Sequence, residues 1–98
     1  MKRTASVPTP NAQRYMTQLS KHWAHKFEVV LDGSTSVIAL PAGKVFLEAS
    51  DSLLGLRIEA PAESDLDRLA EVVEQHIDRF AHREGGLAYN WLESAEPD

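Results

Sequence analysis

The chain contains no cysteine. Its 98 residues therefore form no disulfide, hold no metal through thiolates and use no cysteine nucleophile. Long apolar runs are also missing, which excludes a membrane span, and the first residues lack the apolar segment of a secretory signal. No glycine-rich phosphate loop is present, because Gly85-Gly86 follows a predicted helix instead of preceding one. Because a membrane span and a secretory signal are both missing, we expect a cytoplasmic protein.

Acidic residues are absent from the first 27 positions, which carry five lysines and arginines. The rest of the chain carries five Lys and Arg against all fifteen Asp and Glu, so the formal charge changes from +5 to −10 between the two parts. The basic segment can bind an anion or nucleic acid, or pair with the acidic part of the same chain. Of these two interpretations, we favour charge pairing between the basic segment and the acidic part of the same chain. A net charge of −5 and the lack of a binding motif argue against nucleic acid.

The composition that is present, 43% hydrophobic and 26% charged, is typical of one small globular domain. We expect a single domain over residues 1–98. Residues 1–9 and 94–98 are predicted to be flexible tails, with at most an edge strand over 3–7.

Helix signals begin at Thr9, a good N-cap, and Pro10, a good first helical residue. They predict a helix that runs to about Phe27. Its apolar positions share one face, as expected of a helix that packs on a sheet; they are Ala12, Tyr15, Met16, Leu19, Trp23 and Phe27.

Four strands are predicted next. Residues 28–31 and 34–40 are joined by Asp32-Gly33, a strong hairpin signal, and strands over 44–49 and 54–60 complete an antiparallel meander.

A second helix is predicted to begin at Ser64, which forms a capping box with Asp67, and to be stopped by Gly85-Gly86. A last strand is predicted over 87–92. The order helix, four strands, helix, strand favours an α+β two-layer sandwich, with a mostly antiparallel sheet and both helices on one face. The bare face would carry Phe46 and whichever of Trp91 and Leu92 points outward, a candidate homodimer surface.

Two histidines, His22 and His25, lie three positions apart on a helix without acidic residues. His22 falls about 60° from the centre of the apolar stripe, and His76 has the same offset of about 60° on the second helix. These two margins face each other only if the helices pack antiparallel. They would then line one groove, for which we predict eight ligand-binding residues: Arg14, Gln18, Lys21, His22, His25, His76, Arg79 and Arg83.

Several chemistries suit such a groove. Its arginines and lysine favour a small anionic ligand, which arginine holds bidentately. The alternative is a metal site in which His22, His25 and His76 bind Zn or Fe, although acidic ligands are scarce nearby. A small enzyme with histidine as general acid or base is a further alternative, with Ser20 as the only adjacent hydroxyl.

A plainer interpretation needs no ligand. A histidine at the margin of an apolar face often packs on the core edge and bonds a carbonyl, and we expect this first of His76. We expect simple solvent exposure for His25 and His82.

The segments Arg14-Tyr15, 18–26 and 76–84 resemble a bacterial domain-of-unknown-function family, family 2218, and the resemblance spans nearly the whole chain. Members occur alone or beside siderophore-interacting proteins, so the resemblance implies a link to iron or siderophore metabolism. The chain departs from the family at Ser20, usually Cys, and at His82, usually Phe. The matching positions are Arg14, Lys21, His22, His25, His76, Arg79 and Arg83.

Together these observations favour a binding or docking module over an enzyme. The predicted partner is a small anionic ligand or another protein, with no resident cofactor, nucleic acid or membrane.

Overall fold

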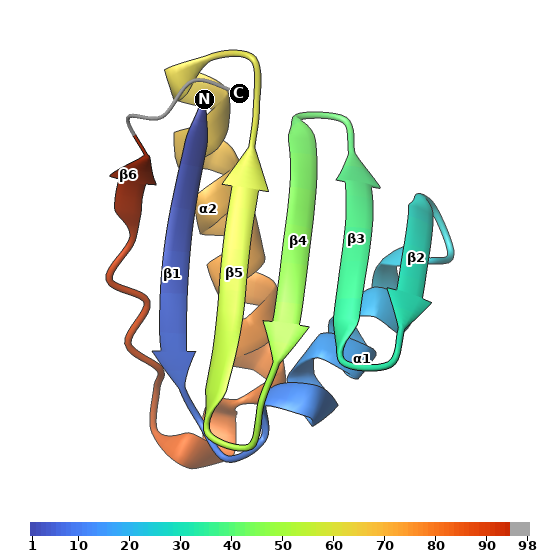
Figure 1. Cartoon of the computed structure of the whole chain (residues 1–98), viewed down its shortest axis with the longest axis vertical. Helices are drawn as coiled ribbons and strands as arrows, with labels where there is room; N and C mark the ends of the chain where they lie inside the picture. Colours follow the sequence, from blue (N-terminus) through green and yellow to red (C-terminus); the bar gives the residue numbers. More distant parts are fainter. Residues whose placement is uncertain (95–98) are drawn as a thin grey trace.

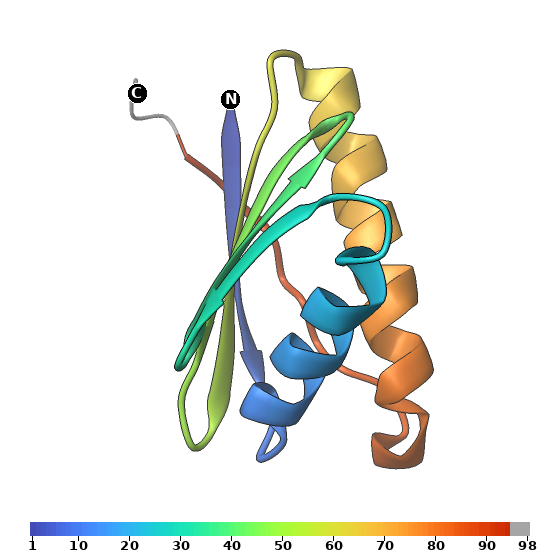
Figure 2. The same ribbon diagram turned by 90° about the vertical axis from the view of Figure 1, so that its right-hand side faces the viewer.

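The computed structural model describes residues 1–94, which form a six-stranded antiparallel sheet with two helices on one face (Figures 1 and 2). The predicted α+β class is thus confirmed. Across the sheet the strand order is β2-β3-β4-β5-β1-β6. In chain order the elements are β1 (Lys2–Pro8), α1 (Ala12–Trp23), β2 (Glu28–Asp32), β3 (Thr35–Leu40), β4 (Gly43–Ala49), β5 (Leu53–Glu59), α2 (Glu63–Phe80), the 3-10 turn η1 (His82–Glu84) and β6 (Leu92–Ser94).

The N-terminal segment differs from the expected tail with an edge strand. It forms β1, which lies inside the sheet between β5 and β6 (Figure 1). Ala5 and Val7 are buried, whereas Thr4 and Ser6 are exposed on the other face. Two inward apolar residues are a weak local signal, because cross-strand pairs with β5, distant in sequence, stabilise this strand.

Helix α1 begins at Ala12, with Asn11 and not Thr9 as its N-cap. Thr9 is buried, and its hydroxyl donates to the Glu84 carboxylate (2.8 Å) while its oxygen accepts the amide hydrogen of Asn11 (3.1 Å), one residue before the helix. Pro10 therefore precedes the helix, and the predicted start is two residues too early.

The same helix ends at Trp23, not near Phe27. The Trp23 carbonyl accepts the amide hydrogens of both Lys26 (3.1 Å) and Phe27 (2.9 Å), which turns the chain toward β2. His25 consequently lies in this turn and not on the helix.

Strands β2 to β5 form the predicted meander, with shifts of one residue at strand ends. Asp32 pairs with Thr35, so the hairpin loop is Gly33-Ser34, one residue later than predicted, and Gly33 supplies a positive φ of 61°.

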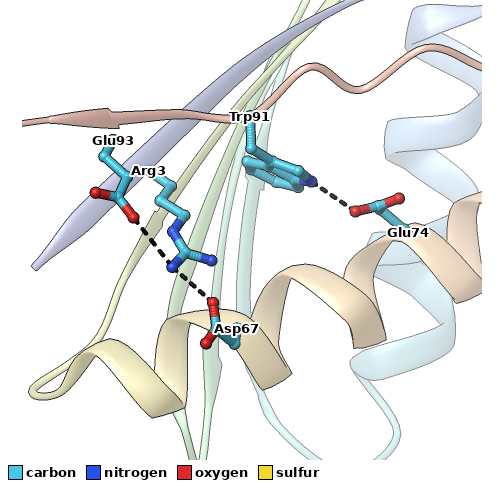
Figure 3. Close-up of polar contacts among 5 residues, drawn as sticks. All are labelled: Arg3, Asp67, Glu74, Trp91 and Glu93. Atoms are coloured by element: carbon cyan, nitrogen blue, oxygen red, sulfur yellow. Dashed lines mark hydrogen bonds and ion pairs between the residues drawn. The ribbon is translucent and has the colours of Figure 1, made fainter.

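Helix α2 begins at Glu63 after Ala62, and the predicted capping box is wrong. Ser64 is inside the helix, and the Asp67 carboxylate instead pairs with the Arg3 guanidinium of β1 at 2.6 Å (Figure 3).

The segment after α2 is not the predicted strand over 87–92. The helix ends at Phe80, before the glycines, and η1 follows. Gly85 (φ 76°) and Asn90 (φ 42°) have positive φ, which is incompatible with a continuous strand.

The chain then returns to the sheet as β6, where Ser94 pairs with Lys2. Trp91 anchors this return, because its indole nitrogen donates to the Glu74 carboxylate of α2 at 2.6 Å (Figure 3). The predicted tail thus begins within β6, and residues 95–98 lie outside the described residues.

The core fills the space between the sheet and the helices. Each helix buries one apolar face, and neither helix in residues 1–94 is long and apolar enough to cross a membrane. The largest fully enclosed side chains are Val7, Met16, Leu19, Ser20, Ser36, Ile38, Val45, Leu54, Ile58, Leu69, Val73 and Ile77.

Candidate functional site

The helices α1 and α2 run in roughly opposite directions across the same face of the sheet (Figure 2). This arrangement brings His22 of α1 to His76 of α2, with ring centroids 5.4 Å apart and ring planes inclined at 47°. The condition stated for the two histidines to face each other, antiparallel packing of the helices, is therefore met. We call the line along which the two helices meet the seam.

His76 is held from two sides. Its ring lies 4.9 Å from the Trp23 ring, and its Nδ1 donates to the Val72 carbonyl at 2.8 Å. The expectation that His76 packs on the core margin and bonds a carbonyl is therefore confirmed. In the neutral ring this bond leaves Nε2 as an acceptor, so the orientation of His76 is fixed while one nitrogen stays available.

The His22 side chain is exposed and makes no hydrogen bond within residues 1–94. One turn earlier, Gln18 is half-buried, and its side-chain Oε1 is buried without a hydrogen-bond partner in the described residues. A half-turn of this amide would present NH2 at the same place. A buried, unsatisfied polar group thus lies one helical turn from a histidine whose side chain has no hydrogen-bond partner in the described residues.

Four predicted cations, Arg14, Lys21, Arg79 and Arg83, are exposed and form no ion pair with any described residue. Arg3 behaves differently, because it pairs with both Asp67 (2.6 Å) and Glu93 (3.3 Å). Internal charge pairing thus holds for Arg3, whereas these four cations stay available.

The eight predicted residues do not meet at one point. Lys21 is adjacent to His22 in sequence, and Arg79 lies one turn after His76. Arg14 precedes His22 by eight residues, about 12 Å along the helix. Arg83 belongs to η1, whose Glu84 contacts the start of α1.

A three-histidine metal group is not assembled. His25 is exposed in the turn after α1, and no three His, Asp or Glu side chains in residues 1–94 gather closely enough to hold a metal ion. His82, exposed as expected, bonds the Arg79 carbonyl.

The Ser20 hydroxyl, the nucleophile of the enzyme alternative, is buried. It lies 2.6 Å from the Ser36 hydroxyl of β3, so it is directed toward the sheet. Nothing in this placement brings it to the histidines.

A pocket of about 310 Å³ opens beside the seam where α1 ends. It adjoins the histidines, because Trp23 contacts His76 and Val72 carries the carbonyl that His76 bonds. The end of α1, the turn between β3 and β4, and α2 supply its walls, which are Trp23, Phe27, Leu40, Pro41, Ala42, Arg68, Leu69 and Val72.

Arg68 is the charged residue of this pocket, and sequence reasoning missed it. Its spacing in the sequence could have indicated it, since Arg68, Val72 and His76 follow one another at intervals of four residues. They therefore share one side of α2.

A larger hollow of about 410 Å³ lies on the bare face of the sheet. Its arginine is already engaged, since the Arg57 guanidinium stacks 4.1 Å above the Phe46 ring, and Glu48 contributes a carboxylate that would repel an anion. On this face Leu92, opposite Thr4, is 67% exposed, so of the two predicted residues it is the one that points outward. The homodimer stays a prediction.

The Glu84 carboxylate and the three side chains that donate to it form a structural cluster. Glu84 accepts hydrogen bonds from Tyr15, Asn11 and Thr9, and these bonds hold the pKa of its carboxyl below the ordinary value despite partial burial. Burial, with the bond to Glu84, raises the pKa of Tyr15. The cluster fastens the start of α1 to η1.

Comparison with known proteins finds similar proteins in bacteria. A family model described as "Uncharacterized protein conserved in bacteria (DUF2218)" matches residues 4–92. The NMR structure of PA4090 from Pseudomonas aeruginosa is 32% identical and superposes with a TM-score of 0.77, covering 98% of this chain and 100% of that one. Comparison with curated proteins finds no match.

Proposed function

The chain belongs to the bacterial family DUF2218, and we propose that it is a binding module for a small anion, held at the seam between α1 and α2. The observation that carries the proposal is the meeting of His22 and His76, 5.4 Å apart, at a place where neighbouring cations have no partner within residues 1–94.

The groups at the seam suit an anion in charge and in hydrogen bonding. Lys21 and Arg79 supply positive charge next to the two rings, and the donor comes from the His22 ring or from the imidazolium form of His76. The Gln18 amide, unsatisfied at its buried oxygen, gains a partner when its NH2 turns toward the ligand. Arg14 and Arg83, farther along the seam, would add long-range attraction more than direct contact.

An anion fits better than a metal ion at this place. Two histidines without a nearby carboxylate offer fewer ligands than a typical zinc site requires, and free arginine and lysine side chains repel a cation. Zinc or iron bound by His22 and His76 is the second candidate, favoured only by the closeness of the rings.

Amide chemical-shift mapping of the 15N-labelled protein tests this function. Inorganic phosphate and citrate are expected to shift the amides of residues 18–23 and 76–80 saturably. The His22→Gln variant should lose most of this response, whereas the matched His82→Gln variant, altered at an exposed histidine outside the seam, should keep it.

Two results would contradict the proposal: no saturable response to either anion, or an equal loss in both variants. A response at the seam to zinc chloride without a response to anions would favour the metal. We include a role in iron or siderophore metabolism in this proposal. Titration of the labelled protein with ferric citrate, followed by the same amide shifts, tests that role.

A further inference from the structure

The pocket beside the seam is lined by apolar side chains and one arginine. Seven of its eight lining residues are apolar, among them Trp23, Phe27 and Leu69, and the eighth is Arg68. Arg68 is exposed and forms no ion pair with an acidic residue in the part of the chain that the structure describes. A concave apolar surface with one free positive charge matches a molecule that has an apolar body and one negative charge.

We infer that this pocket binds a small apolar carboxylic acid, with its hydrocarbon part against Trp23 and Leu69 and its carboxylate on Arg68. This second site does not depend on the anion proposed for the histidines.

The size of the pocket limits the ligand. A dry cavity of roughly 150 Å³ holds one benzene molecule. A volume of about 310 Å³ is twice that and lies at the lower end of the range for small-molecule sites. It suits one aromatic ring with a short side chain, or an aliphatic acid of moderate length.

Trp23 makes the two sites neighbours. One part of its ring system faces His76, and the residue also lines the pocket. A ligand in the pocket should therefore shift the His76 resonances slightly, even in the His22→Gln variant, where the site at the histidines is removed.

Titration with matched ligands tests the inference by amide shift mapping. Hexanoate is expected to shift the amides of Leu40, Ala42 and residues 68–72 saturably. Each methylene from butyrate to hexanoate should tighten binding about fourfold. Hexanol, which lacks the charge, should bind about tenfold more weakly than hexanoate.

Variants of the whole chain assign the interaction to residues. Arg68→Gln should weaken hexanoate on the order of tenfold and leave hexanol unchanged. Arg57→Gln, on the opposite face of the sheet, should change neither. Ala42→Phe, a substitution on the partly exposed turn, should fill the pocket and weaken both ligands.

The inference is overturned if hexanoate binds no better than acetate, if hexanol equals hexanoate, or if Arg68→Gln and Arg57→Gln behave alike. Because His22→Gln should retain hexanoate binding, failure of this site is distinguished from failure of the anion site at the seam.

Discussion

His22 and His76 lie with their rings 5.4 Å apart, although they belong to different helices separated in sequence by four strands. The contact depends on two local anchors, the Val72 carbonyl that fixes Nδ1 of His76 and the Trp23 ring against which that imidazole packs. The His76 ring is therefore held in place beside His22 before a ligand binds, which reduces the entropy cost of binding.

Glu84 makes stability depend on pH. Its folded-state pKa is depressed, mainly by the hydrogen bond from Tyr15, so its contribution is complete above the unfolded-state value of about 4.3 and is lost as pH falls through the folded-state pKa. We expect Glu84→Gln to cost about 1–3 kcal/mol at pH 7 and progressively less near pH 3. Urea unfolding at both pH values measures this, and an equal loss at both would be inconsistent with a charged acceptor.

Trp91 anchors the C-terminal segment to α2 through the indole hydrogen bond to Glu74 (Figure 3). Trp91→Phe removes this donor and is expected to destabilise the protein by about 1–3 kcal/mol, because the carboxylate loses a charge-assisted bond. Amide exchange should accelerate in residues 89–94 first. Leu92→Ala, at a mostly exposed side chain, is the control and should change little. Unchanged exchange in Trp91→Phe would show that the bond does not hold the segment.

The buried hydroxyls of Ser20 and Ser36 form a pair that links α1 to β3. Removing either one leaves the other unsatisfied, so Ser20→Ala and Ser36→Ala should each cost about 1–3 kcal/mol. The double variant should cost clearly less than their sum, because no orphaned hydroxyl is left. A thermal-denaturation cycle measures the difference, and strict additivity would contradict the pairing.

Gly43 opens β4 at a place without room for a side chain. A Cβ there would collide with the Glu59 carbonyl oxygen of β5, a rigid backbone group. We expect Gly43→Ala to destabilise the protein by about 1–3 kcal/mol. At Gly55 an added Cβ meets its nearest atom at 3.5 Å, an ordinary contact, so Gly55→Ala should be tolerated. Equal stability of the two variants in urea would refute this explanation.

Much of the fold could be predicted because its signals are local. Helical periodicity placed Leu19 and Val73 in the core and His22 and His76 at the margins of their helices, and alternation indicated the strands of the meander. Each of these patterns depends on residues a few positions apart.

The errors have a common physical origin in contacts between distant parts of the chain. Thr9 was predicted to be the N-cap, but the helix begins at Ala12 and the Thr9 hydroxyl donates to Glu84, whereas Asp67 was predicted to form a capping box but pairs with Arg3. His25 lies outside α1 because the chain turns toward β2 after Trp23. Residues 24–27 contain no glycine or proline that would have indicated this turn. Arg68 lines a pocket only because the turn between β3 and β4 lies against α2, a contact between parts of the chain that are distant in sequence.

The central claim, that His22 and His76 together hold an anion, is tested most directly by the imidazole 15N resonances during titration with inorganic phosphate. We predict that the ring nitrogens of both histidines shift along one saturation curve, while those of His25 and His82 stay in place. A uniform drift of all four histidines, or no shift at His22 and His76, would contradict the account.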